Sequence, residues 1–306
     1  IIDARTEAEF VDDHIPGSVN LPALNEEEYA EVGEIARSQS PRVHALGVSA
    51  ALKRVGDHVA RLAGRPAARS ALVYCLRGGK RSLVWSGALK AMDIEAKILP
   101  GGWKSYRKWV VASLQRLSCY FEYRLIAGKI GSGQEQLLKA IEAEGGQVLD
   151  LGAIGNRFGM PLSWLAETEQ PSQRLFESLL LDAMRGLSND SPVWVVNWGN
   201  RVGSAKLPEM LVQCLKRSSR VELVAPMPVR VRTIMKIHEG KLNQLPEVAK
   251  RMREWTSVQV SASALEEWER LAREPKPAAA LERMLEDYFD EQYAAWRVEG
   301  PGDEAQ

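Results

Sequence analysis

Residues 71–82 read Ala-Leu-Val-Tyr-Cys-Leu-Arg-Gly-Gly-Lys-Arg-Ser, and they give the strongest indication of the fold in the first third of the chain. The run from Ala71 to Cys75 is short and apolar, which is typical of a buried strand. Two glycines follow it, and a helical pattern then runs from Arg81 to Met92. A buried strand, a glycine loop and a helix in succession predict one unit of a parallel sheet covered by helices.

Short apolar runs alternate with helical patterns on both sides of this stretch. Before residue 115 we expect further strands at 1–2, 18–21 and 97–99 and a mostly helical segment over 26–63. A second cycle has strand-like runs at 122–126, 148–150, 193–196 and 220–224, a helix over 134–144, and a helical pattern after residue 229. The sequence therefore predicts an α/β protein of two parallel-sheet domains, residues 1–115 and 116–306, the second with a helical C-terminal extension.

Composition narrows the class of protein. The 306 residues are 45% apolar and 26% charged, which excludes a disordered chain or a collagen-like fibre. No apolar run reaches the roughly 18 residues that a membrane span needs, so we expect no membrane association. The three cysteines, Cys75, Cys119 and Cys214, are too few and too far apart in sequence to predict a metal site or a disulfide framework. They favour a reducing, cytoplasmic compartment.

Charge is balanced overall but unevenly distributed. Lys plus Arg and Asp plus Glu each number 40, yet residues 201–253 hold twelve basic and four acidic residues, and residues 254–306 hold five basic and thirteen acidic. A basic segment of this kind is a candidate polyanion surface. The alternative is a set of solvated helix faces that pair with the acidic end of the chain. The candidate residues for contact with such a polyanion are Arg201, Lys206, Arg230, Arg232, Lys236 and Lys241.

Cys75 stands where the buried strand ends and the glycine loop begins. Backbone N–H groups of such a loop converge on one point, and the following helix adds its partial positive charge. We therefore expect an anion cradle around the thiol, formed by Arg77, Gly78, Gly79, Lys80 and Arg81. A thiol in this setting has a lowered pKa and acts as a nucleophile. The alternative is a buried structural cysteine beside a solvated basic loop.

The spacing between Cys75 and Arg81 also fits another class of enzyme. Cysteine phosphatases and arsenate reductases hold an oxyanion in a loop of this length. Those enzymes usually place a His before the Cys and use a separate Asp as the acid, whereas Tyr74 precedes Cys75 here.

A second glycine loop lies in the second predicted domain. Gly128, Lys129, Gly131, Ser132 and Gly133 belong to a stretch with the spacing of a Walker A phosphate loop, between a predicted strand and a predicted helix. The Lys and Ser/Thr that should follow are Gln134 and Glu135, so ordinary nucleotide hydrolysis is not expected. Gln134 retains a hydrogen-bond donor, and Lys129 offers a replacement charge. The alternative is a domain that has kept the fold and lost the ligand.

Several motifs resemble known families. Asp3-Ala-Arg5, the stretch 14–22 (His-Ile-Pro-Gly-Ser-Val-Asn-Leu-Pro) and Leu99-Pro-Gly-Gly-Trp103 resemble the signatures of the rhodanese family. That resemblance implies a rhodanese-like first domain in which Cys75 carries a persulfide or its selenium counterpart. It also implies that His14 is structural and that Asp3 and Arg5 form an internal ion pair.

A rhodanese-like domain followed by a P-loop-like domain is similar to the tRNA 2-selenouridine synthase family. Supporting stretches include Gln170-Pro-Ser-Gln173 and Val221-Glu-Leu-Val-Ala-Pro226. The resemblance implies a transferase that replaces the sulfur of wobble 2-thiouridine in tRNA with selenium through a geranylated intermediate. Its cosubstrates would be geranyl diphosphate and selenophosphate, with no tightly bound cofactor, no metal, and a selenophosphate-supplying enzyme as partner. Two alternatives remain: a chalcogen carrier with a non-catalytic second domain, and a tRNA-binding protein with a dead phosphate loop.

Overall fold

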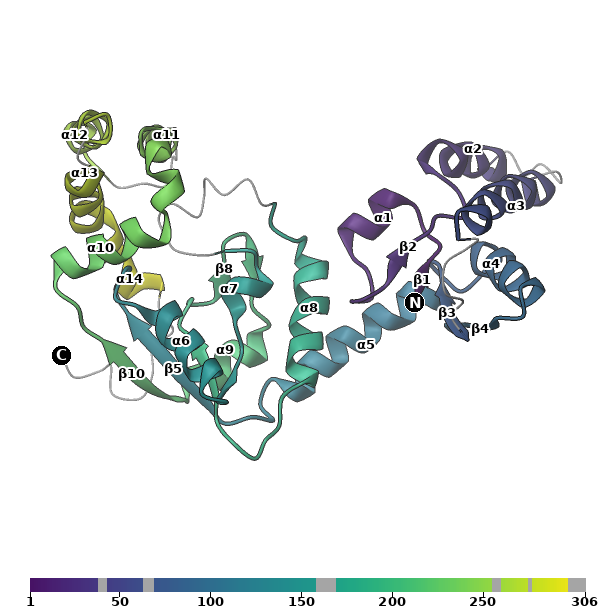
Figure 1. Ribbon diagram of the computed structural model, residues 1–306, viewed down its shortest axis with the longest axis horizontal. Helices are drawn as coiled ribbons and strands as arrows, with labels where there is room; N and C mark the ends of the chain where they lie inside the picture. Colours follow the sequence, from purple (N-terminus) through teal and green to yellow (C-terminus); the bar gives the residue numbers. More distant parts are fainter. Residues whose placement is uncertain (38–42, 63–68, 158–168, 255–259, 275–276, 297–306) are drawn as a thin grey trace. The chain divides into compact units, whose positions relative to one another are not determined.

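The computed structural model describes residues 1–37, 43–62, 69–157, 169–254, 260–274 and 277–296. It divides into two compact units, the first made of residues 1–113 and 172–182 and the second of residues 114–171 and 183–306. Both units are mixed α/β with parallel sheets, the predicted fold class (Figure 1). Residues 172–182 pack with the first unit, although the predicted boundary assigns them to the second domain.

The first unit is built on a parallel sheet in the order β2-β1-β3-β4. Its strands are β1 (Ile2–Asp3), β2 (Val19–Asn20), β3 (Ser70–Tyr74) and β4 (Glu95–Ile98). Its helices are α1 (Glu7–Asp12), α2 (Glu26–Arg37), α3 (Val43–Leu62), α4 (Lys80–Ala91) and α5 (Gly102–Leu117), the last of which continues into the second unit. Trp85 and Val73 are fully buried in the core between this sheet and its helices.

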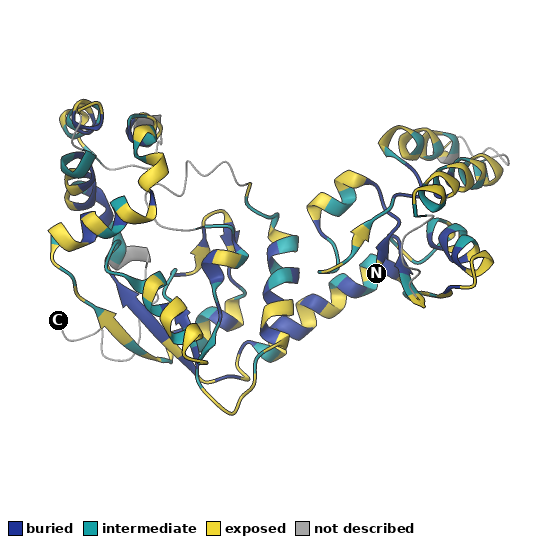
Figure 2. Cartoon of the chain, viewed as in Figure 1, coloured by how far each residue is buried: buried dark blue, intermediate teal, exposed yellow. Residues whose placement is uncertain are grey.

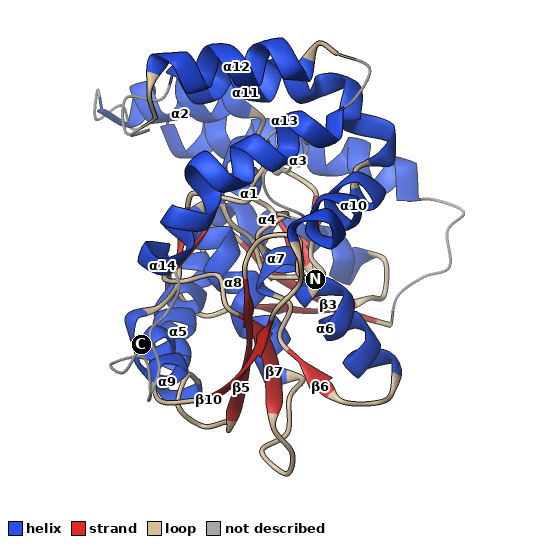
Figure 3. Ribbon diagram, turned by 90° about the vertical axis from the view of Figure 1, so that its left-hand side faces the viewer, coloured by secondary structure: helices blue, strands red, loops and turns tan. Residues whose placement is uncertain are grey.

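The second unit holds another parallel sheet, in the order β10-β5-β7-β6 (Figure 3). Its strands are β5 (Tyr123–Gly128), β6 (Gln147–Val148), β7 (Val193–Val196) and β10 (Ser219–Leu223), and the hairpin strands β8 (Arg201–Val202) and β9 (Ala205–Lys206) form a separate two-stranded sheet. Strand β5 lies between two neighbours and is buried over most of its length, whereas the surrounding helices expose their outer faces (Figure 2). The loop after β5 is therefore anchored to the centre of the sheet.

Helices make up the rest of this unit. Those before β10 are α6 (Gln134–Ala143), α7 (Leu151–Ile154), α8 (Gln173–Arg185), whose first residues belong to the first unit, and α9 (Glu209–Lys216). Those after it are α10 (Met227–Ile237), the 3-10 segment η2 (Glu239–Gln244), α11 (Leu245–Glu254), α12 (Ala262–Ala272), α13 (Pro277–Met284), the π-helical segment η3 (Leu285–Phe289) and α14 (Asp290–Trp296). These C-terminal helices share a core around the fully buried Trp268 and Phe289.

Within the described residues, no helix has the length and apolar character needed to cross a membrane. The same residues contain no cluster of three His, Cys, Asp or Glu side chains that could hold a metal ion.

Candidate functional site

Cys75 lies directly after β3, at the carboxyl end of the first sheet. Strand β3 pairs with β1 on one side and β4 on the other, so the residue that follows it is held by the centre of the sheet. The side chain is 4% exposed, and the chain then turns through residues 76–79 into α4. The predicted order of strand, cysteine, glycine loop and helix is what the structure has.

The thiol is surrounded by hydrogen-bond donors. The backbone N–H of Gly79 donates to Cys75 Sγ at 3.2 Å. Burial raises the pKa of the thiol, but polar contacts with the Ser82 side chain and with the N–H groups of Arg77, Ser82 and Gly79 outweigh this effect, and the net pKa is lowered. A thiol with a lowered pKa is ionised over a wider range of pH, and the thiolate is the form that acts as a nucleophile.

Two glycines let a neighbouring turn support the cysteine loop. Gly78 and Gly102 have φ values of +69° and +58°, in the left-handed region that favours glycine. A Cβ on Gly102 would lie 2.1 Å from Cys75 O and 2.5 Å from Gly78 N. In addition, Trp103 N donates to Cys75 O at 2.8 Å. The start of α5 therefore fixes the backbone of the loop that surrounds the thiol.

The three cations of the predicted cradle differ in their surroundings. Arg81 donates to Glu9 at 2.6 Å and stacks over the ring of Tyr29 at 4.6 Å. Lys80 is exposed and contacts His44, and Arg77 is exposed. Of the three cations expected to add positive charge to the cradle, Arg81 is paired with the Glu9 carboxylate, which offsets part of its charge. The lowered pKa of the thiol comes from its hydrogen bonds.

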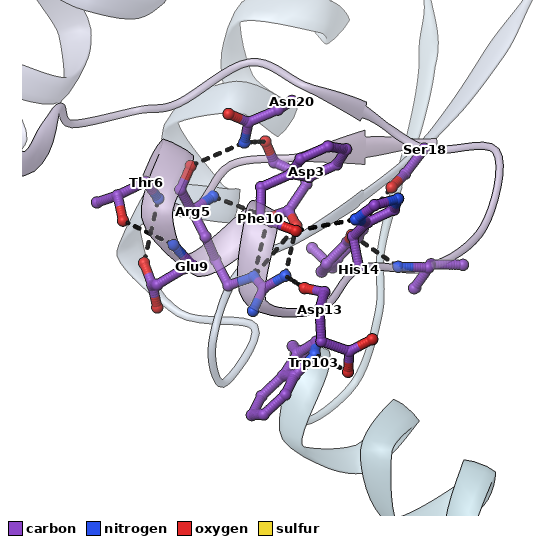
Figure 4. Close-up of polar contacts among 12 residues, drawn as sticks. Asp3, Arg5, Thr6, Glu9, Phe10, Asp13, His14, Ser18, Asn20 and Trp103 are labelled. Atoms are coloured by element: carbon purple, nitrogen blue, oxygen red, sulfur yellow. Dashed lines mark hydrogen bonds and ion pairs between the residues drawn. The ribbon is translucent and has the colours of Figure 1, made fainter. Parts of the chain in front are cut away.

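A buried network holds the start of the chain in place (Figure 4). Asp3 and Arg5 form the predicted internal ion pair at 2.6 Å, with both side chains at most 2% exposed. Arg5 also donates to Asp13 O at 2.5 Å. His14 Nδ1 bonds to Phe10 O at 2.9 Å, and the two rings stack, which is a structural arrangement. Glu9 caps α1 by accepting from Thr6 N, so the carboxylate that binds Arg81 is itself fixed.

Asp13 is a buried carboxylate that the sequence did not single out. It is 0% exposed and accepts hydrogen bonds from Trp103 Nε1 at 2.8 Å and Ser178 Oγ at 2.7 Å. Burial raises the pKa of Asp13 despite these donors. Arg107 contacts Glu177 nearby. The first turns of α8 are therefore bonded to the rest of the first unit, and α8 begins at the end of the 170–173 motif.

The second glycine loop joins β5 to α6, as predicted. Gly128, Gly131 and Gly133 have φ values of +148°, +84° and +97°. A Cβ on Gly131 would lie 2.7 Å from Arg230 O, so α10 packs directly on the loop. The Gln134 side-chain amide turns back and donates to Gly128 O and, at 3.1 Å, to Lys129 O. It is therefore engaged with the loop's own carbonyls and does not present its donors to a phosphate.

The cations at this loop have carboxylate partners. Lys129 Nζ lies 3.1 Å from Asp290 Oδ2, and Arg230 binds both oxygens of Asp290 at 2.8 and 2.5 Å. Arg230 is 3% exposed, so its assignment as a tRNA-binding residue is wrong: it is a buried partner of Asp290. The other five candidate tRNA-binding residues, namely Arg201, Lys206, Arg232, Lys236 and Lys241, are exposed.

Two cysteines that we expected to be unpaired lie together. Cys119 and Cys214 are paired as a disulfide, with their Cα atoms 5.7 Å apart, although 95 residues separate them in sequence. The prediction that the cysteines are too far apart for a disulfide is therefore wrong. Cys119 follows α5 and Cys214 lies on α9, and the tertiary fold brings these elements together. Cys75 is the free cysteine.

Comparisons with known proteins match each of the two parts of the chain to a known family. The model of the family described as tRNA 2-selenouridine synthase AAA domain matches residues 121–267, and that of the Rhodanese-like domain matches residues 1–108. A tRNA 2-selenouridine synthase of Nitrosomonas europaea is 31% identical over 76% of this chain and 62% of its own length. Proteins of the same name from Bdellovibrio bacteriovorus and Pseudomonas putida are 30% and 28% identical, covering 93% and 99% of this chain and 76% and 90% of their own lengths.

Proposed function

The chain belongs to the tRNA 2-selenouridine synthase family, and from that premise we propose that it replaces the sulfur of wobble 2-thiouridine in tRNA with selenium. One observation carries the proposal: a buried thiol at the end of β3 that accepts the Gly79 N–H at 3.2 Å and whose pKa is lowered by polar groups of its loop. Such a thiol is suited to nucleophilic work on a chalcogen atom.

The exchange that we propose has two stages. In the first, the sulfur of 2-thiouridine attacks the terminal carbon of geranyl diphosphate, so a carbon–sulfur bond forms, a carbon–oxygen bond breaks and diphosphate leaves. In the second, the selenium of selenophosphate bonds to the C2 carbon of the base and the carbon–sulfur bond breaks, so that the sulfur leaves as geranyl thiol. Water then cleaves the selenium–phosphorus bond, and phosphate is released. Selenium enters and sulfur leaves in the same oxidation state, so the exchange needs no external oxidant.

Cys75 is the residue that we assign to the selenium stage. The N–H groups of the loop stabilise negative charge on an atom bound there, as they stabilise the thiolate. The same arrangement supports sulfur carriage. Thiolate attack on the outer sulfur of thiosulfate forms one sulfur–sulfur bond, breaks another and releases sulfite. Loading of Cys75 by thiosulfate is thus a balanced test of chalcogen binding.

The substrate that we propose is a polyanion, and the second unit offers exposed cations. Arg201 and Lys206 face each other across the β8–β9 hairpin as register partners. Arg232 and Lys236 are one turn apart on α10, so they lie on the same side of that helix. Contacts of this kind hold tRNA phosphates without reading the sequence. We place the reaction in the cytoplasm, with a selenophosphate-supplying enzyme as partner.

A second function is favoured by the phosphate loop. The amide of Gln134 is engaged with the loop carbonyls, and Asp290 neutralises the cations beside it. A protein with this loop and an intact Cys75 site would act as a chalcogen carrier that hands sulfur or selenium to another protein. In that case the second unit would serve as a docking module.

One assay separates the two functions. Purified protein is incubated with tRNA that contains 2-thiouridine, together with geranyl diphosphate and selenophosphate, and the nucleosides are analysed by mass spectrometry. Formation of 2-selenouridine that requires both cosubstrates supports the synthase. Loading of Cys75 with sulfur from thiosulfate in a parallel incubation, with no change in the tRNA, supports the carrier. A tRNA left unchanged and a Cys75 that is never loaded would contradict both functions.

A further inference from the structure

The C-terminal helix α14 presents an anion to the phosphate loop. Lys129 of the loop and Arg230 of α10 both bind the Asp290 carboxylate, at 3.1 Å and at 2.8 and 2.5 Å. One turn further along the helix, the Tyr293 hydroxyl accepts the backbone N–H of Gly128 at 2.6 Å. Two cations and the first N–H of the loop are thus taken up by residues that lie far away in sequence.

These contacts form one arrangement around a buried guanidinium. Arg230 is 3% exposed, and its Nε donates to Ile130 O at 2.8 Å, so the guanidinium is fixed to the loop itself. Burial raises the pKa of Asp290, but its hydrogen bonds to Arg230 and Lys129 outweigh this and lower it, so the carboxylate is ionised at neutral pH. A charged, bidentate pair of this kind is among the strongest polar contacts in proteins.

The same donors would suit a phosphate. A phosphate oxyanion, like a carboxylate, accepts a bidentate Arg, a Lys and backbone N–H groups. The glycine conformations of a phosphate loop are retained at Gly128, Gly131 and Gly133. Ser132 Oγ is buried and finds no hydrogen-bond partner within the described ranges. The loop therefore has a hydroxyl donor, Ser132, that makes no such bond. The two cations that a phosphate would bind, Lys129 and Arg230, are bound by the Asp290 carboxylate.

We propose that Asp290 and Tyr293 form an internal anion plug on the phosphate loop, and that a diphosphate-bearing ligand binds only by displacing α14. The inference rests on the proposed function for the class of ligand, a diphosphate, but not for the plug. The plug makes the loop a gated site: the cations that a ligand needs become available only when the C-terminal helix leaves. Occupancy of the loop and order of α14 are therefore coupled.

The test is calorimetric titration of the full chain with inorganic pyrophosphate. Asp290→Asn keeps the shape of the side chain and removes its charge, so the competing hydrogen bonds become neutral and weaker. We expect pyrophosphate to bind about tenfold more tightly than to the parent, since charge-assisted hydrogen bonds are about twice as strong as neutral ones. Glu291→Gln is the matched control, with the same loss of charge on the next residue of α14, and should leave the affinity unchanged.

A second variant and a second measurement complete the test. Arg230→Gln together with Asp290→Asn leaves no buried charge unpaired, and should lose the affinity gained by Asp290→Asn alone. In the parent, saturating pyrophosphate should increase hydrogen exchange of the backbone amides of α14. Equal affinity in the parent and the Asp290→Asn variant, or binding without any change in exchange of α14, overturns the proposal. Absence of pyrophosphate binding in every variant overturns it as well.

Failure of this inference is distinguishable from failure of the proposed function. Pyrophosphate titration needs no tRNA and no selenium donor, so the effect of Asp290→Asn is measured whether or not the protein makes 2-selenouridine. Conversely, the protein could make 2-selenouridine although Asp290→Asn leaves its pyrophosphate affinity unchanged. That result would support the proposed function and overturn the anion plug.

Discussion

Replacing Gly102 by Ala should disable the Cys75 site without touching the thiol. The added Cβ would lie 2.1 Å from Cys75 O, 2.5 Å from Gly78 N and 2.9 Å from Arg77 N, all of them backbone atoms of the cysteine loop. These atoms cannot rotate away as a flexible side chain would, so the loop itself must shift. The φ of +58° adds a cost of roughly 1–2 kcal/mol for a residue with a side chain.

The shift should appear in the reactivity of the thiol. A charge-assisted hydrogen bond contributes about 1.5–3 kcal/mol. Loss of one N–H donor to the thiolate therefore raises the pKa of Cys75 by about one to two units, since a unit corresponds to 1.36 kcal/mol. At a pH below the parent pKa the thiolate fraction falls by roughly tenfold to a hundredfold, and alkylation slows accordingly.

The assay is alkylation of Cys75 by iodoacetamide, followed by peptide mapping across a pH series. Gly87→Ala is the matched control, because Gly87 lies within α4 and no atom approaches within 4 Å of the Cβ it would gain. This control should stabilise the protein by about 0.5–1 kcal/mol and leave the alkylation rate unchanged. Parent-like alkylation in Gly102→Ala would refute the reasoning that the α5 turn shapes the thiol site.

Three further predictions concern the thiol, its nearest ion pair and the tRNA. Ser82→Ala removes a contact that lowers the pKa of Cys75, so the midpoint of its alkylation profile should move to higher pH, whereas Ser86→Ala, one turn along α4, should not move it. Glu9→Gln leaves Arg81 without its carboxylate and should cost about 2 kcal/mol in denaturant unfolding. Burial raises the pKa of Glu9, but its contacts with Arg81 lower it by more, so the pKa is lowered overall. The stabilisation is therefore present above the ordinary pKa of a glutamate and should be lost as the pH falls below it. Parallel pH profiles of stability in the parent and the Glu9→Gln variant would contradict this prediction. Arg232→Gln with Lys236→Gln should weaken tRNA binding and flatten its salt dependence by about 0.7–0.9 per lost phosphate contact, while Arg270→Gln with Arg273→Gln, at the C-terminal end of α12 and outside the basic segment, should change neither.

The sequence predicted those parts of the fold whose signal is local. The apolar run before Cys75 and the glycines after it mark β3, the loop and α4 because a strand end, a turn and a helix start each depend on neighbouring residues. The same holds for β5, the second glycine loop and α6. The β8–β9 hairpin was missed because Arg201 and Lys206, half of its strand residues, are charged, so it has no apolar run that would indicate a strand.

Contacts between distant residues could not be predicted in this way. Arg230 belongs to a basic segment and was therefore expected at the surface, but it is buried against Asp290, sixty residues later. Asp13 meets Ser178 across 165 residues, and Cys119 meets Cys214 across 95. Sequence spacing carries no information about such distances. The excess of acidic residues after residue 254 was the available signal for Asp290, and it pointed to the alternative in which basic residues pair with the acidic end of the chain.

The proposed function assigns Cys75 to the selenium stage and separates that stage from geranylation. The most direct measurement gives the Cys75→Ser variant tRNA with 2-thiouridine, geranyl diphosphate and selenophosphate, and follows the nucleosides by mass spectrometry over time. We expect geranylated 2-thiouridine to accumulate with Cys75→Ser and no 2-selenouridine to form, while the parent forms 2-selenouridine under the same conditions. Formation of 2-selenouridine by Cys75→Ser at the rate of the parent would contradict this assignment.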